Sequence, residues 1–322
     1  MIQSPAAATL RFAPILLFLL LLGAFGLSSP RFLEPQNLVN IALQSSSTAI
    51  AATGMTFALL TAGVDLSVGA IMFVAVAVAG KMVHHGQPIA LAFVAALAAG
   101  AAFGALNGLL VARLRILAFI ATLGTLFAGR GFGLWLTETR AMNMPESVTR
   151  LGTDRWLGVP WAPLAALAAV CLLAHAVLSA TPFGRMIYAT GHDAEAARKA
   201  GVPVRRILFC VYLISGLCAA AGGLVALTQT GAVSPKFGEQ KEFAAIAAAV
   251  LGGVSLFGGR GAVLPGALLG ALLIQTVENG LVILNANPYI YPMVTSGIIF
   301  LAVLLDSIRN RAQHSLPGGG HP

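Results

Sequence analysis

The chain's clearest chemical motif spans residues 63–69, Gly-Val-Asp-Leu-Ser-Val-Gly, at the start of an apolar stretch. An aspartate at the start of a helix accepts hydrogen bonds from backbone N–H groups that have no partner in the first turn. The two glycines permit a break in the helical path. Two interpretations are open: Asp65 caps a helix in an ordinary loop, or Gly63, Asp65, Ser67 and Gly69 interrupt discontinuous helices beside a cavity.

A run of polar residues, Gln-Ser-Ser-Ser-Thr at positions 44–48, lies in the middle of a long apolar segment. Polar groups at membrane depth are tolerated only where they are buried in protein or line a cavity. We therefore expect this segment to line a solute pathway, with aromatic side chains as stacking surfaces. The expected pathway residues are Asn40, Gln44, Ser45, Ser46, Ser47, Phe57 and Phe119.

Residues 181–203 form a third informative stretch, between two apolar segments. Asp193 is a suitable N-cap for a two-turn helix, Glu195 and Lys199 are spaced for an i,i+4 pair, and Gly201 stops the helix. Small residues share one face of this helix: Ala194, Ala197 and Ala200. We expect a short helix that lies on another protein; the alternative is a plain connector, which the defined helix ends disfavour.

Enzyme motifs are absent from the sequence. Gly80-Lys81 is followed by Met82 and has no upstream glycine where a Walker A loop requires one. No HExxH, CxxC or GxSxG pattern occurs, and the adjacent His84 and His85 fit a solvated turn better than a metal site. We expect no catalytic residue, no metal and no cofactor.

The composition defines the class of protein. Of the 322 residues 58% are hydrophobic and only 9% are charged, with a net charge of +8. A soluble fold of this size could not cover its surface with so few charges, and the basic residues do not cluster as in nucleic-acid binding proteins. The composition therefore predicts a multi-pass membrane protein with little mass outside the bilayer.

A spanning helix needs about 20 mostly apolar residues. The hydropathy pattern predicts an all-α fold in a single transmembrane domain over 1–322, with spans between about 12 and 306 and a disordered tail at 310–322. The first segment is expected to be retained rather than cleaved as a signal peptide. The ten expected spans are Phe12–Leu27, Asn37–Gly63, Leu66–Met82, Pro88–Ala112, Ile116–Thr137, Trp156–Ser179, Val204–Gln229, Phe243–Phe257, Val263–Leu284 and Tyr289–Asp306.

Basic residues favour an orientation with both termini in the cytoplasm, because more of them then fall in cytoplasmic segments. Asn-Gly-Leu occurs at Asn107 and again at Asn279, on segments that would run in opposite directions, as an inverted-topology duplication would produce. Glycines four residues apart, at Gly100, Gly104 and Gly108, predict one helix face that packs closely on a neighbour.

Taken together, these motifs resemble the membrane permease subunit of carbohydrate ABC importers, of the ribose, xylose, arabinose and galactose type. The resemblance covers about residues 10–310 and is specific only as a set. The matching stretches are Gly63–Gly69, Asn107–Arg115 with Ala121–Thr125, Thr181–Pro203 with Ser215-Gly216-Leu217, Gly252–Ser255 and Gly258-Gly259.

The resemblance implies a fold with ten helices per subunit in the bacterial inner membrane. It also implies a second permease copy or a paralogue, cytoplasmic ATPase subunits and a periplasmic sugar-binding protein as partners. ATP hydrolysis would then belong to the ATPase. The residues implied in ATPase coupling are Gly184, Arg185, Gly191, Asp193, Glu195, Ala196, Ala197, Arg198 and Gly201.

Two alternatives stay open at this point. A secondary transporter is also helical, but it needs no docking helix and more often buries paired carboxylates, for which only Glu278 and Asp65 are available. A permease for branched-chain amino acids is a milder resemblance, and the Asp-Leu-Ser sequence at 65–67 favours the sugar type.

Overall fold

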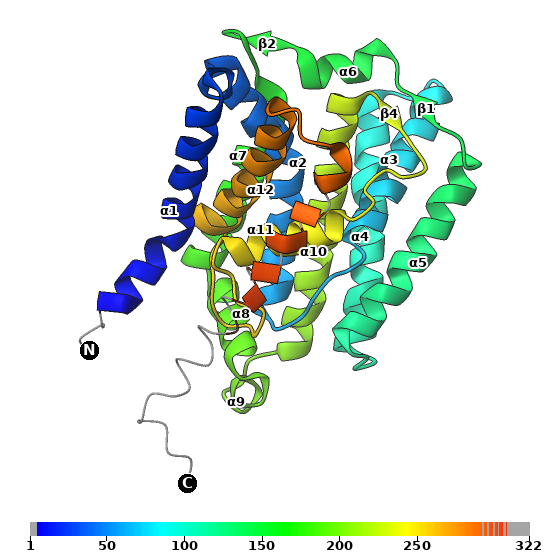
Figure 1. Ribbon diagram of the computed structural model, residues 1–322. Helices are drawn as coiled ribbons and strands as arrows, with labels where there is room; N and C mark the ends of the chain where they lie inside the picture. Colours follow the sequence, from blue (N-terminus) through cyan, green and yellow to red (C-terminus); the bar gives the residue numbers. More distant parts are fainter. Residues whose placement is uncertain are drawn as a thin grey trace.

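The computed structural model describes residues 5–291 and, beyond them, residues 293, 294, 296–298, 300, 301, 303, 304 and 307. The predicted tail at 310–322 and parts of the last predicted span lie outside these residues. The described part is mostly helical, as expected, with long helices aligned roughly side by side (Figure 1).

The helices are α1 (Pro5–Ser28), α2 (Pro35–Leu60), α3 (Val68–His84), α4 (Ile89–Ala112), α5 (Ala118–Thr137), α6 (Glu146–Thr153), α7 (Trp161–Ala180), α8 (Pro182–His192), α9 (Ala194–Lys199), α10 (Val204–Thr230), α11 (Lys241–Leu251) and α12 (Leu268–Ile283). Short helical turns are η1 (Pro30–Leu33), η2 (Val263–Ala267) and η3 (Pro288–Ile290). Two-residue strands form two antiparallel pairs, β1 (Met142–Asn143) with β4 (Ala232–Val233) and β2 (Arg155–Trp156) with β3 (Val159–Pro160).

Five helices among the described residues are long and apolar enough to cross a membrane: α4, α5, α7, α10 and the continuous stretch Val263–Ile283. Two shorter apolar helices, Pro14–Ser28 and Val68–His84, accompany them. The chain is therefore a multi-pass helical membrane protein; the number of ten spans stays a prediction.

Two predicted spans need correction. The predicted helix Phe243–Phe257 is wrong, because α11 has 11 residues and so is about 17 Å long, against about 30 Å of hydrocarbon. The helix ends at Leu251, and two residues later Gly253 adopts a φ of +93°, which a helix cannot continue through. The helix predicted from Trp156 begins at Trp161 instead, because Trp156 belongs to the β2–β3 hairpin.

Helix α2 lies at the centre of the bundle, packed by α10, α11, α12 and α7. Every residue from Ser45 to Leu60 is buried. Hydroxyl groups along it donate to carbonyl oxygens one turn earlier, as Thr53 does to Ala49 at 2.8 Å and Thr56 to Ala52 at 2.8 Å. These bonds satisfy the polar groups inside the bundle, and the polar residues keep α2 below the apolarity of a simple spanning helix.

Helix α4 packs on α10 through the glycine face that the sequence predicts. A Cβ atom at Gly104 would lie 2.5 Å from the carbonyl oxygen of Tyr212, and one at Gly100 would lie 2.6 Å from that of Gly216. Only glycine permits the two backbones to approach this closely. The prediction of a close-packed face is confirmed.

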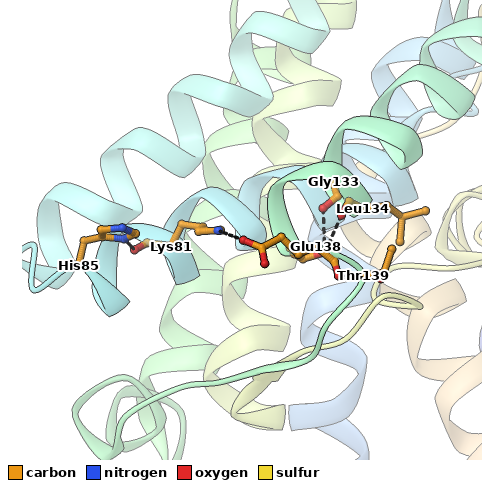
Figure 2. A network of polar contacts seen from close by, with 7 residues as sticks. Lys81, His85, Gly133, Leu134, Glu138 and Thr139 are labelled. Carbon is orange, nitrogen blue, oxygen red and sulfur yellow. Dashed lines mark hydrogen bonds and ion pairs between the residues drawn. The ribbon is translucent and has the colours of Figure 1, made fainter.

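The two ends of the bundle differ (Figure 1). We call them the α6 end, which carries α6 and the strands, and the α9 end, which carries α8 and α9. At the α6 end, Lys81 on α3 pairs with Glu138 beyond α5, with 3.3 Å between Nζ and Oε1 (Figure 2). Both side chains are exposed to solvent, so this pair contributes little stability.

Candidate functional site

A cavity of about 960 Å³ lies where α2, α11 and α12 meet the segment around 291–303. Gln275 Nε2 donates to Gln44 Oε1 at 2.8 Å across it, and Lys241 Nζ donates to Thr48 Oγ1 at 3.3 Å nearby. Most of the polar lining consists of amide groups, which donate and accept hydrogen bonds, together with carboxylates that accept them and an ammonium group that donates them. The lining residues are Gln44, Glu239, Gln240, Lys241, Phe243, Ala244, Gln275, Glu278, Asn279, Val282, Tyr291, Ser296, Phe300 and Val303.

Helix α12 supplies its polar groups from one face. Gln275, Glu278, Asn279 and Val282 are three or four residues apart, and this spacing aligns side chains along a helix. Asn279 also exchanges two hydrogen bonds with Asn37 at the start of α2, at 2.9 and 3.0 Å. These bonds fix α12 against α2 at the rim of the cavity.

The short helix α11 brings its first turn to the cavity. The chain runs from β4 through the loop 234–240, and α11 begins after Gln240, whose φ is +62°. Arg130 of α5 holds this loop by donating from Nη1 to the carbonyl oxygen of Phe237 at 2.6 Å, and its guanidinium lies 5.6 Å from the centre of the Phe73 ring. The first N–H group of α11, that of Lys241, donates to the carbonyl oxygen of Gly238 at 3.2 Å, which ties the helix start to the loop before it.

Of the predicted pathway residues, only Gln44 lines the cavity. The three serines after it are at most 4% exposed and face the bundle interior. Ser45 and Ser46 donate to carbonyl oxygens of their own helix, and Ser47 Oγ donates to the carbonyl oxygen of Gly222 on α10 at 2.8 Å. Asn40 accepts a hydrogen bond from Gln36 and lies outside the lining.

The two aromatic residues expected to stack on a solute are not at the cavity. Phe57 is 1% exposed and belongs to the core, so its ring has no free face. Phe119 is 56% exposed at the start of α5, away from the lining residues. Neither ring lines this cavity, and a stacking role for either residue elsewhere on a solute pathway stays a prediction.

Residues of the 63–69 motif form a buried polar cluster between α2 and α3. Asp65 is fully buried and accepts hydrogen bonds from the backbone N–H of Ser67 at 3.0 Å, from Ser67 Oγ at 2.5 Å and from Ser215 Oγ of α10 at 2.6 Å. Asn107 of α4 donates to Ser67 Oγ at 2.8 Å and accepts from Thr125 of α5 at 2.7 Å. The cluster as a whole therefore connects α3, α4, α5 and α10, and Asp65 does not cap α3, whose N-cap is Ser67.

The glycines of this motif allow close contacts. A Cβ atom at Gly63 would collide with the hydroxyl of Tyr212, and one at Gly69 with the carboxylate of Glu242 and the carbonyl oxygen of Gly238. The chain thus passes from α2 to α3 in a short turn packed on α10 and on the loop before α11.

The short helix at 193–200 has the local structure that the sequence predicts. Asp193 Oδ1 accepts from the backbone N–H groups of Glu195 at 2.8 Å and Ala196 at 2.9 Å, and Glu195 pairs with Lys199 at 3.2 Å. The hydrogen bonds from Ala196 and Glu195 hold the pKa of Asp193 below its ordinary value. Gly201 follows with a φ of +87°, as a helix stop requires.

Not all of the residues expected to contact a partner are accessible. Ala197 is 6% exposed and packs on its own chain, and Gly184 and Gly191 are buried, the last tightly against the C-terminal turn of α2. The expected flat face is therefore corrected. The exposed residues of 181–203 are Pro182, Arg185, Ala189, His192, Asp193, Ala194, Glu195, Ala196, Arg198, Lys199, Ala200, Gly201 and Pro203.

Sequence reasoning missed most of the cavity. Glu239, Gln240, Lys241 and Gln275 were not among the expected site residues, although Glu278 stood out as a charge within an apolar segment. The signal that could have found Gln275 is its spacing, one turn before Glu278 on an otherwise apolar helix.

Comparisons with known proteins identify the family of this chain. Residues 37–304 match the family described as "Branched-chain amino acid transport system / permease component". The chain is 39% identical to the ribose import permease protein of Escherichia coli (strain K12), over 91% of this chain and 92% of that protein. It is 37% identical to the ribose import permease protein of Bacillus subtilis (strain 168), over 92% of each chain.

A third relative is the fructose import permease protein of Rhizobium meliloti, with 36% identity over 94% of this chain and 86% of that protein. No solved structure matches the chain significantly. Family membership decides against a secondary transporter, the alternative that the sequence alone left open. The chain belongs to the family of membrane permease components of carbohydrate ABC importers.

Proposed function

We propose that this chain is the permease subunit of an importer that moves a monosaccharide across the bacterial inner membrane. The observation that carries the proposal is the cavity of about 960 Å³, lined by amide and carboxyl side chains, in a chain of this family. A monosaccharide presents hydroxyl groups in several directions, and each can donate and accept a hydrogen bond. Gln44, Gln275, Glu278 and Asn279 offer both kinds of partner from two helices.

Ribose, fructose and similar monosaccharides are the substrates to test, because the relatives' names specify ribose, fructose and allose import. A second copy of this chain or a paralogous permease closes the pathway beside the cavity. Selection among sugars rests mainly with a periplasmic sugar-binding protein that docks at the α6 end.

Energy comes from separate cytoplasmic ATPase subunits, and the α9 end is the docking side. Two features support this assignment. The capped helix α9 projects from that end (Figure 1), and basic residues occur in α9 and in the segments next to it and to the ends of α4 and α10. These basic residues are Arg113, Arg115, Arg185, Arg198, Lys199, Arg205, Arg206 and Arg260. With this orientation α1 starts on the cytoplasmic side, because its first turn lies at the α9 end (Figure 1). The cytoplasmic C-terminus, which lies outside the described residues, stays a prediction.

Uptake by the reconstituted complex tests the proposal. We expect Gln275→Leu to lower uptake of radiolabelled sugar at least about tenfold, because it removes a hydrogen-bonding group of the pathway without changing side-chain size greatly. Ser46→Ala is the matched control: this side chain is buried and lies outside the lining. Equal uptake by Gln275→Leu and wild-type complexes, in proteoliposomes containing equal amounts of assembled transporter, would show that the solute does not pass this cavity.

A further inference from the structure

A second pocket, of about 660 Å³, lies at the α9 end between the last turn of α4, the first turn of α10 and α9. Its lining contains both charged and apolar side chains. Four arginines contribute guanidinium groups, whereas Val111 of α4 and Leu208 of α10 contribute apolar surface. The arginines are Arg115, Arg198, Arg205 and Arg206.

The described part of the chain supplies no carboxylate that pairs with the arginines of this pocket. Among the described residues, none of the four arginines forms an ion pair with a carboxylate. Glu195 is the acidic lining residue, and its carboxylate is already paired with Lys199 at 3.2 Å. Four like charges around one pocket repel one another, so a bound anion would stabilise them.

The backbone holds one of these arginines in an uncommon conformation. Arg115 has a φ of +57°, in the left-handed region that arginine rarely adopts. It sits in the turn between α4 and α5, where the backbone N–H groups of Leu114 and Ile116 donate to carbonyl oxygens of the last turn of α4. The turn thus places a guanidinium directly at the end of α4.

The surroundings of Arg115 locate the pocket at the edge of the bilayer. Leu114 is 64% exposed and Leu117 is 71% exposed, so large apolar side chains flank the arginine. On α4 itself, Leu106 and Leu109 are 44% and 43% exposed, so apolar side chains of this helix reach the surface near its last turn. Exposed apolar side chains therefore lie directly beside the basic pocket, as they would at the edge of a bilayer.

We propose that this pocket binds the phosphate headgroup of an acidic phospholipid, with its acyl chains lying along α4. One guanidinium group can donate two parallel hydrogen bonds to the oxygens of a phosphate. Basic pockets at the ends of membrane helices are therefore suited to phosphate headgroups. The exposed leucines beside the pocket favour a lipid over an acidic segment of a soluble protein. The inference does not depend on the transported solute; the orientation proposed above only assigns the lipid to the cytoplasmic leaflet.

Lipid titration of the purified full chain tests the inference. Native mass spectrometry would measure binding of dioleoyl phosphatidylglycerol and, for comparison, dioleoyl phosphatidylcholine with the same acyl chains. We expect tighter binding of phosphatidylglycerol and a loss of about 30-fold in Arg115→Gln/Arg206→Gln, equivalent to about 2 kcal/mol. The matched control is Arg31→Gln/Arg140→Gln, which removes two exposed arginines at the α6 end and should leave the affinity unchanged.

Arg115→Lys/Arg206→Lys keeps the charges and should retain most of the affinity, which gives a reading even if the glutamine variant folds poorly. Equal affinity of the wild type and the glutamine variant for phosphatidylglycerol would overturn the inference. Displacement of the lipid by millimolar inorganic phosphate would also overturn it in favour of a free-anion site. A glutamine variant that keeps the lipid but loses the ATPase subunits would identify the pocket as a protein contact instead.

Discussion

Ser215→Ala tests the buried cluster that joins the helices around Asp65. Ser215 is 0% exposed, and its hydroxyl donates to Asp65 Oδ2 at 2.6 Å. The other carboxyl oxygen receives both hydrogen bonds from Ser67. The substitution therefore leaves Oδ2 without its donor, inside a cluster that is closed to water.

The expected cost follows from that unsatisfied oxygen. Leaving a buried acceptor without a donor costs about 1–3 kcal/mol, more than the net value of an ordinary hydrogen bond. Ser45→Ala is the matched control, because Ser45 is equally buried but donates only to Ala42 of its own helix. The Ser45 hydroxyl competes weakly with the backbone hydrogen bonds of its helix, and alanine is the better helix former. We therefore expect Ser45→Ala to change the free energy of unfolding by about 0.5 kcal/mol or less.

The free energy of unfolding in mixed detergent micelles would measure both substitutions. In an Asp65→Ala background, Ser215→Ala should cost little, since the partner is already gone; the resulting coupling should be about 0.5–3 kcal/mol. If Ser215→Ala and Ser45→Ala change stability equally, or if the coupling is zero, the cluster does not hold the helices together.

Three further predictions concern packing, the short helix and the cavity. Gly104→Leu should destabilise the chain by about 1–3 kcal/mol or prevent its folding, because α10 leaves no room, whereas Gly124→Leu on α5, where an added Cβ atom would meet no other atom within 4 Å, should be nearly neutral in the same unfolding assay. Hydrogen bonds from the backbone lower the pKa of Asp193, so its stabilisation of α9 is present above the ordinary pKa of about 4 and lost as the pH falls through the lowered value. Hydrogen exchange of α9 should show this loss in the wild type and not in Asp193→Asn; the same acid dependence in both would contradict it. In a cysteine-free background, Gln44→Cys should react with a water-soluble thiol reagent and Ser46→Cys should not, and equal reactivity would place the cavity elsewhere.

Local signals in the sequence predicted local structure well. The cap at Asp193, the pair of Glu195 with Lys199 and the stop at Gly201 depend on residues within one or two helical turns. The glycine face of α4 was also predictable, since a four-residue spacing defines a face whatever its neighbour is. The family motifs gave the class of protein for the same reason: they are contiguous stretches of sequence.

Properties that depend on neighbours distant in the chain were not predictable. The polar run of α2 suggested a cavity wall, but α2 is surrounded by other helices, so Ser45 and Ser46 face protein and only Gln44 reaches the cavity. Its partner Gln275 is 231 positions away. The apolar composition around 243–257 likewise concealed the end of α11 at Leu251, which depends on the turn at Gly252 and Gly253.

The central claim is that this chain is the permease of an ATP-driven sugar importer, and a measurement of which energy source drives sugar uptake tests it most directly. Proteoliposomes would contain this chain, its ATPase subunits and a sugar-binding protein, with ATP inside or outside and with or without a proton or sodium gradient. The account predicts that radiolabelled sugar accumulates only when ATP reaches the ATPase and the binding protein is present, whatever the ion gradient. Accumulation driven by an ion gradient without ATP, by this chain alone, would contradict it.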